Sequence, residues 1–306
     1  MARFNPGVCR RSIKSLAVAG LACVLLVAAH AQDSKAVLRV CADPGNMPLS
    51  NSQAEGYENK IAQALARDLG RSIEFTYFPQ RMGFVRNTLR HKDEKTQQFK
   101  CDVIIGVPKG YELTATTQPY MRSTYALIYA SRDDLGELQT AEDLLKLPPA
   151  KLRALRVGVF GRSPGADWLL RNEMLDHAVM YTPQSGDPAE NPAHTIEQAL
   201  AAGKIDMAIV WGPIAGYLVR QHTAFPAWRA VPFMPDQAIK FDYEISMGVR
   251  FGEKQWQETL NTWIGGNRDK VQQILASYRV PLLETATTKM SDAGDGAPAA
   301  KPEAKR

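Results

Sequence analysis

Cysteine and metal-binding patterns are scarce in this sequence. The 306 residues include only four cysteines, and no two have the C-x-x-C spacing of dithiol redox sites. The five histidines are scattered, with no H-E-x-x-H pair, and the residues after Asp43 lack the alternating carboxylates of a calcium loop. These absences argue against the common dithiol, zinc-hydrolase and EF-hand classes. We therefore expect no metal site and no cofactor on this chain.

Long hydrophobic runs are also missing, apart from one near the start. Leu16 to Ala29 is apolar, follows four basic residues with no acid among them, and precedes the small-x-small triplet Ala29-His30-Ala31. This pattern predicts a signal peptide over residues 1–31 and export to the periplasm. An uncleaved anchor helix is the alternative, but fourteen residues span a bilayer poorly. A lipoprotein site at Cys23 fits less well, because Gly20 stands where a large aliphatic residue is needed.

An excess of charge is lacking as well once the leader is set aside. The full sequence has 37 basic and 32 acidic residues, a formal net charge of +5. Removing the four basic leader residues leaves 33 basic against 32 acidic residues. A nearly neutral mature chain gives no indication of nucleic-acid binding.

Two cysteines, Cys41 and Cys101, remain in the mature chain. An even number of cysteines in an oxidising compartment predicts a disulfide between them. The alternative is two buried free thiols. A Cys41–Cys101 bridge would tie the end of the first predicted strand to the start of a later one.

The folded part is built from two similar halves. Leu38-Arg39-Val40 opens the first and Leu155-Arg156-Val157 opens the second, and each strand is followed by a Gly/Pro turn and a helix. Buried strands are predicted at 102–106 and 205–210, so strand–helix alternation occurs twice and predicts parallel α/β sheets. Strand-like runs at 120–130 and 241–250 are expected to cross between the halves. Residues 285–306, rich in Ala, Pro and Lys, are expected to be a disordered tail.

These motifs carry a family resemblance. The segments "LRVCADPGNMPLSN", "EGYENKIA" and "CDVIIGVPKGYELTATTQPYMRSTY" resemble the MoxJ/XoxJ-like proteins associated with quinoprotein dehydrogenases, within the amino-acid-type solute-binding superfamily. The resemblance covers roughly residues 37–284. It implies a two-lobed, type II periplasmic-binding-protein fold with two crossing hinge strands and a cleft between the lobes. The expected organisation is residues 32–123 with 247–284 as lobe 1 and residues 124–246 as lobe 2.

The sequence departs from the amino-acid binders at two positions. Transport members of that superfamily hold the ligand carboxylate with an Arg shortly after the third strand, where this chain has Val107-Pro108-Lys109. They hold the ammonium with an Asp after a later strand, where this chain has Trp211-Gly212-Pro213, expected as a loop. Charge pairing gives such sites their selectivity, so ordinary amino-acid binding is not expected.

The residues expected at the cleft are aromatic, sulfur-containing or polar side chains at strand ends and on the crossing strands. For Arg122 a structural salt bridge is an alternative, as it is for Arg81, and for Tyr125 the alternative is burial in a lobe core. Gly161-Arg162-Ser163-Pro164-Gly165 matches G-x-S-x-G, but Pro164 has no N–H for an oxyanion hole, so Ser163 is expected to cap a helix facing the cleft. The predicted cleft residues are Asp43, Met47, Arg81, Tyr111, Arg122, Tyr125, Ser163 and Trp211.

The resemblance also implies a role and a partner. It points to a non-enzymatic accessory protein that binds a periplasmic PQQ-dependent methanol or alcohol dehydrogenase, or its cytochrome c, and assists maturation. The alternative is an ABC-transporter receptor for a small solute that is not a typical amino acid. A periplasmic enzyme with Glu55 or Glu244 as base has no support beyond the presence of those residues.

Overall fold

The computed structural model describes residues 36–132, 135, 138–183, 191–224 and 226–284. The predicted signal peptide and the predicted tail lie outside these residues. The strands are β1 (Val37–Ala42), β2 (Gly45–Asn46), β3 (Ser50–Asn51), β4 (Ser72–Tyr77), β5 (Val103–Pro108), β6 (Ala115–Ala130), β7 (Val157–Phe160), β8 (Ala178–Tyr181), β9 (Met207–Trp211), β10 (Trp228–Pro232) and β11 (Asp242–Val249).

Helices alternate with these strands, and the described residues include the short 3-10 helices η2 and η3. The helices are α1 (Tyr57–Asp68), α2 (Phe84–Asn87), η2 (Ala141–Lys146), α3 (Pro149–Leu152), α4 (Pro164–Arg171), η3 (Leu175–His177), α5 (Pro192–Ala201), α6 (Gly212–Gln221), α7 (Lys254–Gly266) and α8 (Arg268–Ser277). Among the described residues, no helix is both long and apolar enough to cross a membrane.

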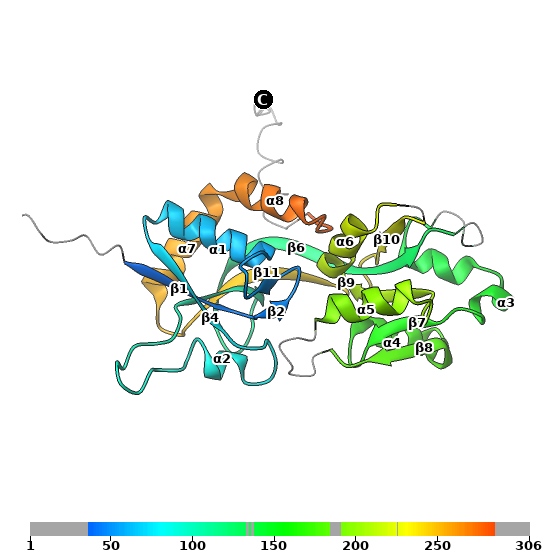
Figure 1. Cartoon of the computed structure of the whole chain (residues 1–306), viewed down its shortest axis with the longest axis horizontal. Helices are drawn as coiled ribbons and strands as arrows, with labels where there is room; N and C mark the ends of the chain where they lie inside the picture. The colour runs from blue at the N-terminus through cyan, green and yellow to red at the C-terminus, as the bar shows by residue number, and fades with distance from the viewer. Residues whose placement is uncertain (1–35, 133–134, 136–137, 184–190, 225, 285–306) are drawn as a thin grey trace, which may run out of the picture. The chain divides into compact units, whose positions relative to one another are not determined.

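Nine strands of the described residues form one sheet in the order β4-β1-β5-β11-β6-β9-β7-β8, with β10 paired to β6, and β2 and β3 pair in a separate two-stranded sheet. The strand pairs β1–β4, β1–β5, β7–β8 and β7–β9 are parallel, as the strand–helix alternation predicts. Figure 1 shows β6 continuing from the strands of one half to those of the other. The molecule therefore has the predicted two-lobed α/β fold.

The buried strands contribute to two cores at once, because successive side chains point to opposite faces of a sheet. In β5, Val103 and Ile105 pack in a first core with α1, α7 and α8, whereas Ile104 packs on the other face with the two cysteines. In β9, Met207 and Ile209 pack on one face and Ala208 and Val210 on the other. This explains why these strands are continuous apolar runs in the sequence.

The chain crosses between the halves twice. In β6, residues up to Thr124 pair with β11 and residues from Tyr125 onward pair with β9. On the return, Phe241 packs in the core of the second half and Ile245 in that of the first. We propose that these crossings separate the two lobes close to the predicted boundaries.

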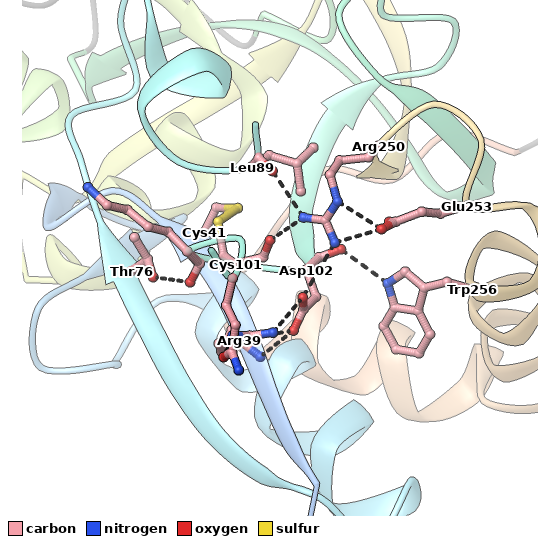
Figure 2. A network of polar contacts seen from close by, with 11 residues as sticks. Arg39, Cys41, Thr76, Leu89, Cys101, Asp102, Arg250, Glu253 and Trp256 are labelled. Atoms are coloured by element: carbon pink, nitrogen blue, oxygen red, sulfur yellow. Dashed lines mark hydrogen bonds and ion pairs between the residues drawn. A yellow bond between two sulfur atoms is a disulfide. The ribbon is translucent and has the colours of Figure 1, made fainter. Parts of the chain in front are cut away.

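The disulfide between Cys41 and Cys101 is present, as predicted, and joins the end of β1 to the residue before β5. Figure 2 shows the polar network beside it. The Arg250 guanidinium donates to the carbonyl oxygens of Leu89 and Cys101 and pairs with the Glu253 carboxylate at 2.7 Å. The Arg250 side chain is 12% exposed, so the segment after β11 is fixed to the disulfide by largely buried bonds.

The two halves also share one arrangement of hydrogen bonds between an arginine and an aspartate. Arg39 donates through its backbone N–H and its guanidinium to the Asp102 carboxylate, and Asp102 N–H donates back to the Arg39 carbonyl. In the second half, Arg156 and Asp206 make the same three kinds of hydrogen bond. The repeated Leu-Arg-Val motif thus marks equivalent strands in the two halves.

Candidate functional site

The candidate site is a cavity of about 250 Å³ at the crossing strands. Its walls include the ends of β5 and β9 and side chains of β6 and β11. Cavities beyond the carboxyl ends of strands are where α/β proteins bind ligands. The lining residues are Leu49, Tyr57, Glu58, Gln80, Gly106, Val107, Pro108, Met121, Tyr125, Trp211, Tyr243 and Ile245.

Three aromatic rings form one wall of this pocket. The Trp211 ring lies between those of Tyr125 and Tyr243, with centroid distances of 5.5 Å and 5.9 Å and edge-on geometry in both pairs. Burial, and then the nearby Tyr243, raises the pKa of Tyr125 to about 12. The three rings therefore present an uncharged, electron-rich surface at neutral pH.

Trp211 lines the pocket, whereas the prediction for its backbone was wrong. Trp211 was expected in a loop, but it ends β9 and is the N-cap of α6, so the strand passes directly into the helix. Gly212 permits this tight junction, because a Cβ there would lie 2.2 Å from the Thr124 carbonyl oxygen. Pro213, within the first turn, has the backbone angle that helix starts prefer.

The pocket is also lined by a buried carboxyl group, that of Glu58. Glu58 lies in the first turn of α1 and is 7% exposed. Among the described residues, none donates a hydrogen bond to its carboxyl group or pairs with it. Burial, with a smaller effect of Asp43, raises the pKa of Glu58 to about 8. The backbone of Gly106 lies so close that a Cβ there would be 2.0 Å from the Glu58 Oε1 atom.

Sequence reasoning did not select Glu58, although a signal was present. The apolar positions Ile61, Leu65 and Leu69 define a buried face of the helix, and Glu58 lies one turn ahead of the buried Ala62. A glutamate at such a position is unusual unless it is paired or has a function. Tyr243 was missed as well, although it lies on a strand that was predicted to cross between the halves.

Two predicted cleft residues come together in the pocket, namely Tyr125 and Trp211. Asp43 lies behind it, where its carboxylate accepts from the backbone N–H groups of Gly45 and Gln80. Asp43 does not line the pocket itself, but its carboxylate fixes the backbone of Gln80, which does.

Arg122 follows the pocket residue Met121 on β6, and because successive side chains of a strand point to opposite faces of the sheet, its side chain points away from the pocket. Its guanidinium pairs with the Asp242 carboxylate at 2.7 Å and donates to the Glu284 carbonyl. This is the salt bridge considered as its alternative role. Arg122 also lines a separate depression of about 350 Å³ with Lys109 and Glu244.

The other four predicted residues are not among those lining the pocket. Met47 is partly buried against the first core, and Tyr111 packs against the cluster that contains the disulfide. Arg81 is exposed. The Ser163 hydroxyl caps α4 by accepting from Ala166 N–H at 3.4 Å, as predicted for a helix start.

No group of three or more histidine, cysteine, aspartate or glutamate side chains is placed to hold a metal ion within the part of the chain that the structure describes. The pocket itself offers one carboxyl group, one amide and several hydroxyl groups around an apolar interior. This arrangement suits recognition of a mostly apolar group with one polar end.

Comparisons with curated proteins and with solved structures place the chain among known proteins. It is 36% identical over 277 residues to Protein MoxJ of Paracoccus denitrificans, covering 87% of this chain and 96% of that protein. The crystal structure of periplasmic binding protein XoxJ from Methylobacterium extorquens AM1 matches with a TM-score of 0.64 and 32% identity, over 81% of this chain and all of that one. MxaJ from Methlophaga aminisulfidivorans MPT matches with a TM-score of 0.65 and 25% identity, over 80% of this chain and all of that one. No family model matches the chain.

Proposed function

This chain belongs to the MoxJ family, and from that premise we propose that it is a periplasmic binding-fold accessory protein that serves a PQQ-dependent methanol or alcohol dehydrogenase. In this proposal it binds the dehydrogenase or a polypeptide segment of it, or its cytochrome c, and assists maturation or activation. It acts by binding and catalyses no reaction. Export to the periplasm, where a relative with the same fold is a periplasmic binding protein, belongs to the same proposal.

The observation that carries this proposal is the composition of the pocket. Its walls are aromatic and aliphatic, and none of the described residues lining it is basic. A free amino acid would leave its carboxylate without a counter-charge there, at a cost of several kcal/mol. An apolar side chain of a polypeptide has no such cost and gains from burial against Trp211 and Met121.

A second candidate function is capture of a small solute for an ABC transporter. The position of the pocket at the strand ends favours it, and the volume of about 250 Å³, just below the range of about 300–1,000 Å³ usual for ligand pockets, limits the solute to a small one. Such a solute would differ from ordinary amino acids for the reason given above. It would raise the melting temperature of the protein at saturation.

The test is assisted refolding of the dehydrogenase large subunit. The subunit, denatured in urea, is diluted into buffer with PQQ and its metal ion, with and without this protein, and light scattering and dye-linked activity are followed. We expect less aggregation and a higher yield of activity with the protein present. Trp211→Ala should remove most of this effect, whereas Phe251→Ala, an exposed aromatic side chain elsewhere, should leave it unchanged.

Equal yields with and without the protein would refute the accessory role. In that case, a panel of small neutral and cationic solutes tested by thermal shift would decide for solute capture. If the wild type and both variants gave the same increased yield of activity, the accessory role would stand, but the pocket would have no part in it.

A further inference from the structure

Glu58 is a buried acid whose role the proposed function does not explain. Among the described residues lining the pocket, it is the only acidic or basic side chain other than the tyrosines. Its carboxyl group has no hydrogen-bond or ion-pair partner among the described residues. Buried polar side chains usually have hydrogen-bond partners, and because the Glu58 carboxyl group lines the cavity, it is open to a partner that enters there.

The missing partner is a cation on grounds of charge. An anion would face a carboxyl group with no basic residue to offset it, whereas a cation would gain both the carboxylate and the aromatic wall. The faces of Trp, Tyr and Phe rings carry a negative quadrupole that attracts ammonium groups within about 6 Å. In this pocket the Trp211 ring contacts the Tyr125 and Tyr243 rings edge-on, and all three residues line the cavity.

The size of the cavity limits the cation further. A volume of about 250 Å³ with aliphatic contacts from Met121 and Ile245 suits a short alkyl chain with one charged end. We propose that the pocket binds an alkylammonium group, carried by a free amine or by a lysine side chain, with Glu58 as its counter-ion and Trp211 as its aromatic contact. Binding of a lysine side chain of a partner protein rests on the proposed function, whereas binding of a free amine does not.

Binding would be coupled to the release of a proton. In the empty pocket burial raises the pKa of Glu58 to about 8, so the carboxyl group holds its proton at pH 7. An ammonium group favours the ionised form, and the proton leaves to solvent as the ion pair forms. The affinity should therefore fall about tenfold for each pH unit below 8 and level off above it.

The other groups that face Glu58 do not account for this response. Asp43 is held by backbone N–H groups and lies behind the wall. Of the neighbouring cations, Lys109 is paired with the Glu244 carboxylate at 2.9 Å, and the Lys240 ammonium lies over the Tyr243 ring at 4.9 Å from its centroid. Burial raises the pKa values of the surrounding tyrosines, which therefore stay neutral through pH 9; they are Tyr57, Tyr120, Tyr125 and Tyr243.

The test is calorimetric titration of the purified protein with butylammonium and with 1-butanol, its neutral analogue, between pH 6 and pH 9. We expect butylammonium to bind at least tenfold more tightly than butanol at pH 8.5, and about fiftyfold more weakly at pH 6 than at pH 8. Glu58→Gln should lose both the tenfold preference and the pH dependence. Glu55→Gln, an exposed acid in the segment before α1, is the matched control and should behave as the wild type. Far-UV circular dichroism confirms that both variants are folded.

Equal affinity for the amine and the alcohol, no binding of either, or unchanged binding in Glu58→Gln would overturn the proposal. A second probe, Nα-acetyl-lysinamide, separates the two sources. Binding as tight as that of butylammonium points to a lysine side chain of a polypeptide, and binding of the free amine alone points to a small solute. Ammonium binding without any effect on dehydrogenase refolding would refute the proposed function and leave this site standing.

Discussion

Replacing Glu58 by glutamine should change how the stability of this protein depends on pH. The substitution keeps the shape of the side chain and removes its titration. In the unfolded chain the Glu58 carboxyl group has its ordinary pKa of 4.5, and in the folded protein burial raises that pKa to about 8. Between these two values the folded state holds a proton that the unfolded state has released.

The sign and size of the effect follow from proton linkage. Since the folded pKa is raised, the contribution of Glu58 to stability is fully present below pH 4.5 and is lost as the pH rises through 8. Each pH unit between them costs about 1.4 kcal/mol, so the whole loss is on the order of 5 kcal/mol. The Glu58→Gln variant would show no such loss, apart from a constant cost of about 1–3 kcal/mol for its unpaired amide.

The assay is urea unfolding of both proteins at pH 5, 6, 7, 8 and 9, with the difference in free energy of unfolding plotted against pH. Other titrating groups are common to both proteins and cancel in this difference. We expect the wild type to lose stability relative to the variant by about 1.4 kcal/mol per unit up to pH 8, with a plateau beyond. A difference that does not vary with pH would show that Glu58 titrates normally and would refute the account of the pocket.

Three further outcomes are expected. Replacing Cys41 and Cys101 by Ser should lower the free energy of unfolding by about 4 kcal/mol, because the bridge closes a 60-residue separation, and reductant should lower that of the wild type by a similar amount. Arg250→Ala should cost about 3–5 kcal/mol in urea unfolding, since two buried carbonyl groups lose their donor. Gly106→Ala should cost about 1–3 kcal/mol through overpacking against the buried carboxyl group, whereas Gly266→Ala, with no atom within 4 Å of the new methyl group, should stay within about 0.5 kcal/mol in the same assay.

Much of the fold could be predicted because its signals are local. The helix after the first strand was placed at 57–69 from Ile61, Leu65 and Leu69 and its stop at Gly70, and α1 spans Tyr57–Asp68. Gly70 does adopt the left-handed conformation, with φ of 65°, that ends helices. The sequence also predicts a helix over residues 84–90, and in the structure this helix, α2, ends at Asn87. The disulfide followed from compartment and parity and is confirmed.

The site was harder to predict because its residues are brought together from distant parts of the chain. Arg122 was expected at the cleft, but its pairing with Asp242 depends on the register between β6 and β11, which no local pattern encodes. The role of Glu58 depends on the absence of any cation paired with it among the described residues, which only the folded chain shows. Tyr125 and Trp211 were singled out in the sequence because both stand where a strand crosses or ends, and both line the pocket. The roles of the predicted cleft residues stay predictions.

The order of the cores along the chain has a consequence for how this protein is assembled. The second core draws its residues from Leu127 to Phe241, a single uninterrupted stretch. The first core takes Leu38 to Met121 and then Ile245 to Val280, so its last part is made after the second core is complete. When the chain is synthesised from its amino end, the apolar faces of α1 and its neighbouring strands therefore stay partly exposed until α7 and α8 have been made. During that interval the Cys41–Cys101 bridge, whose two halves emerge early, is the one covalent link that keeps β1 beside β5 within the described chain.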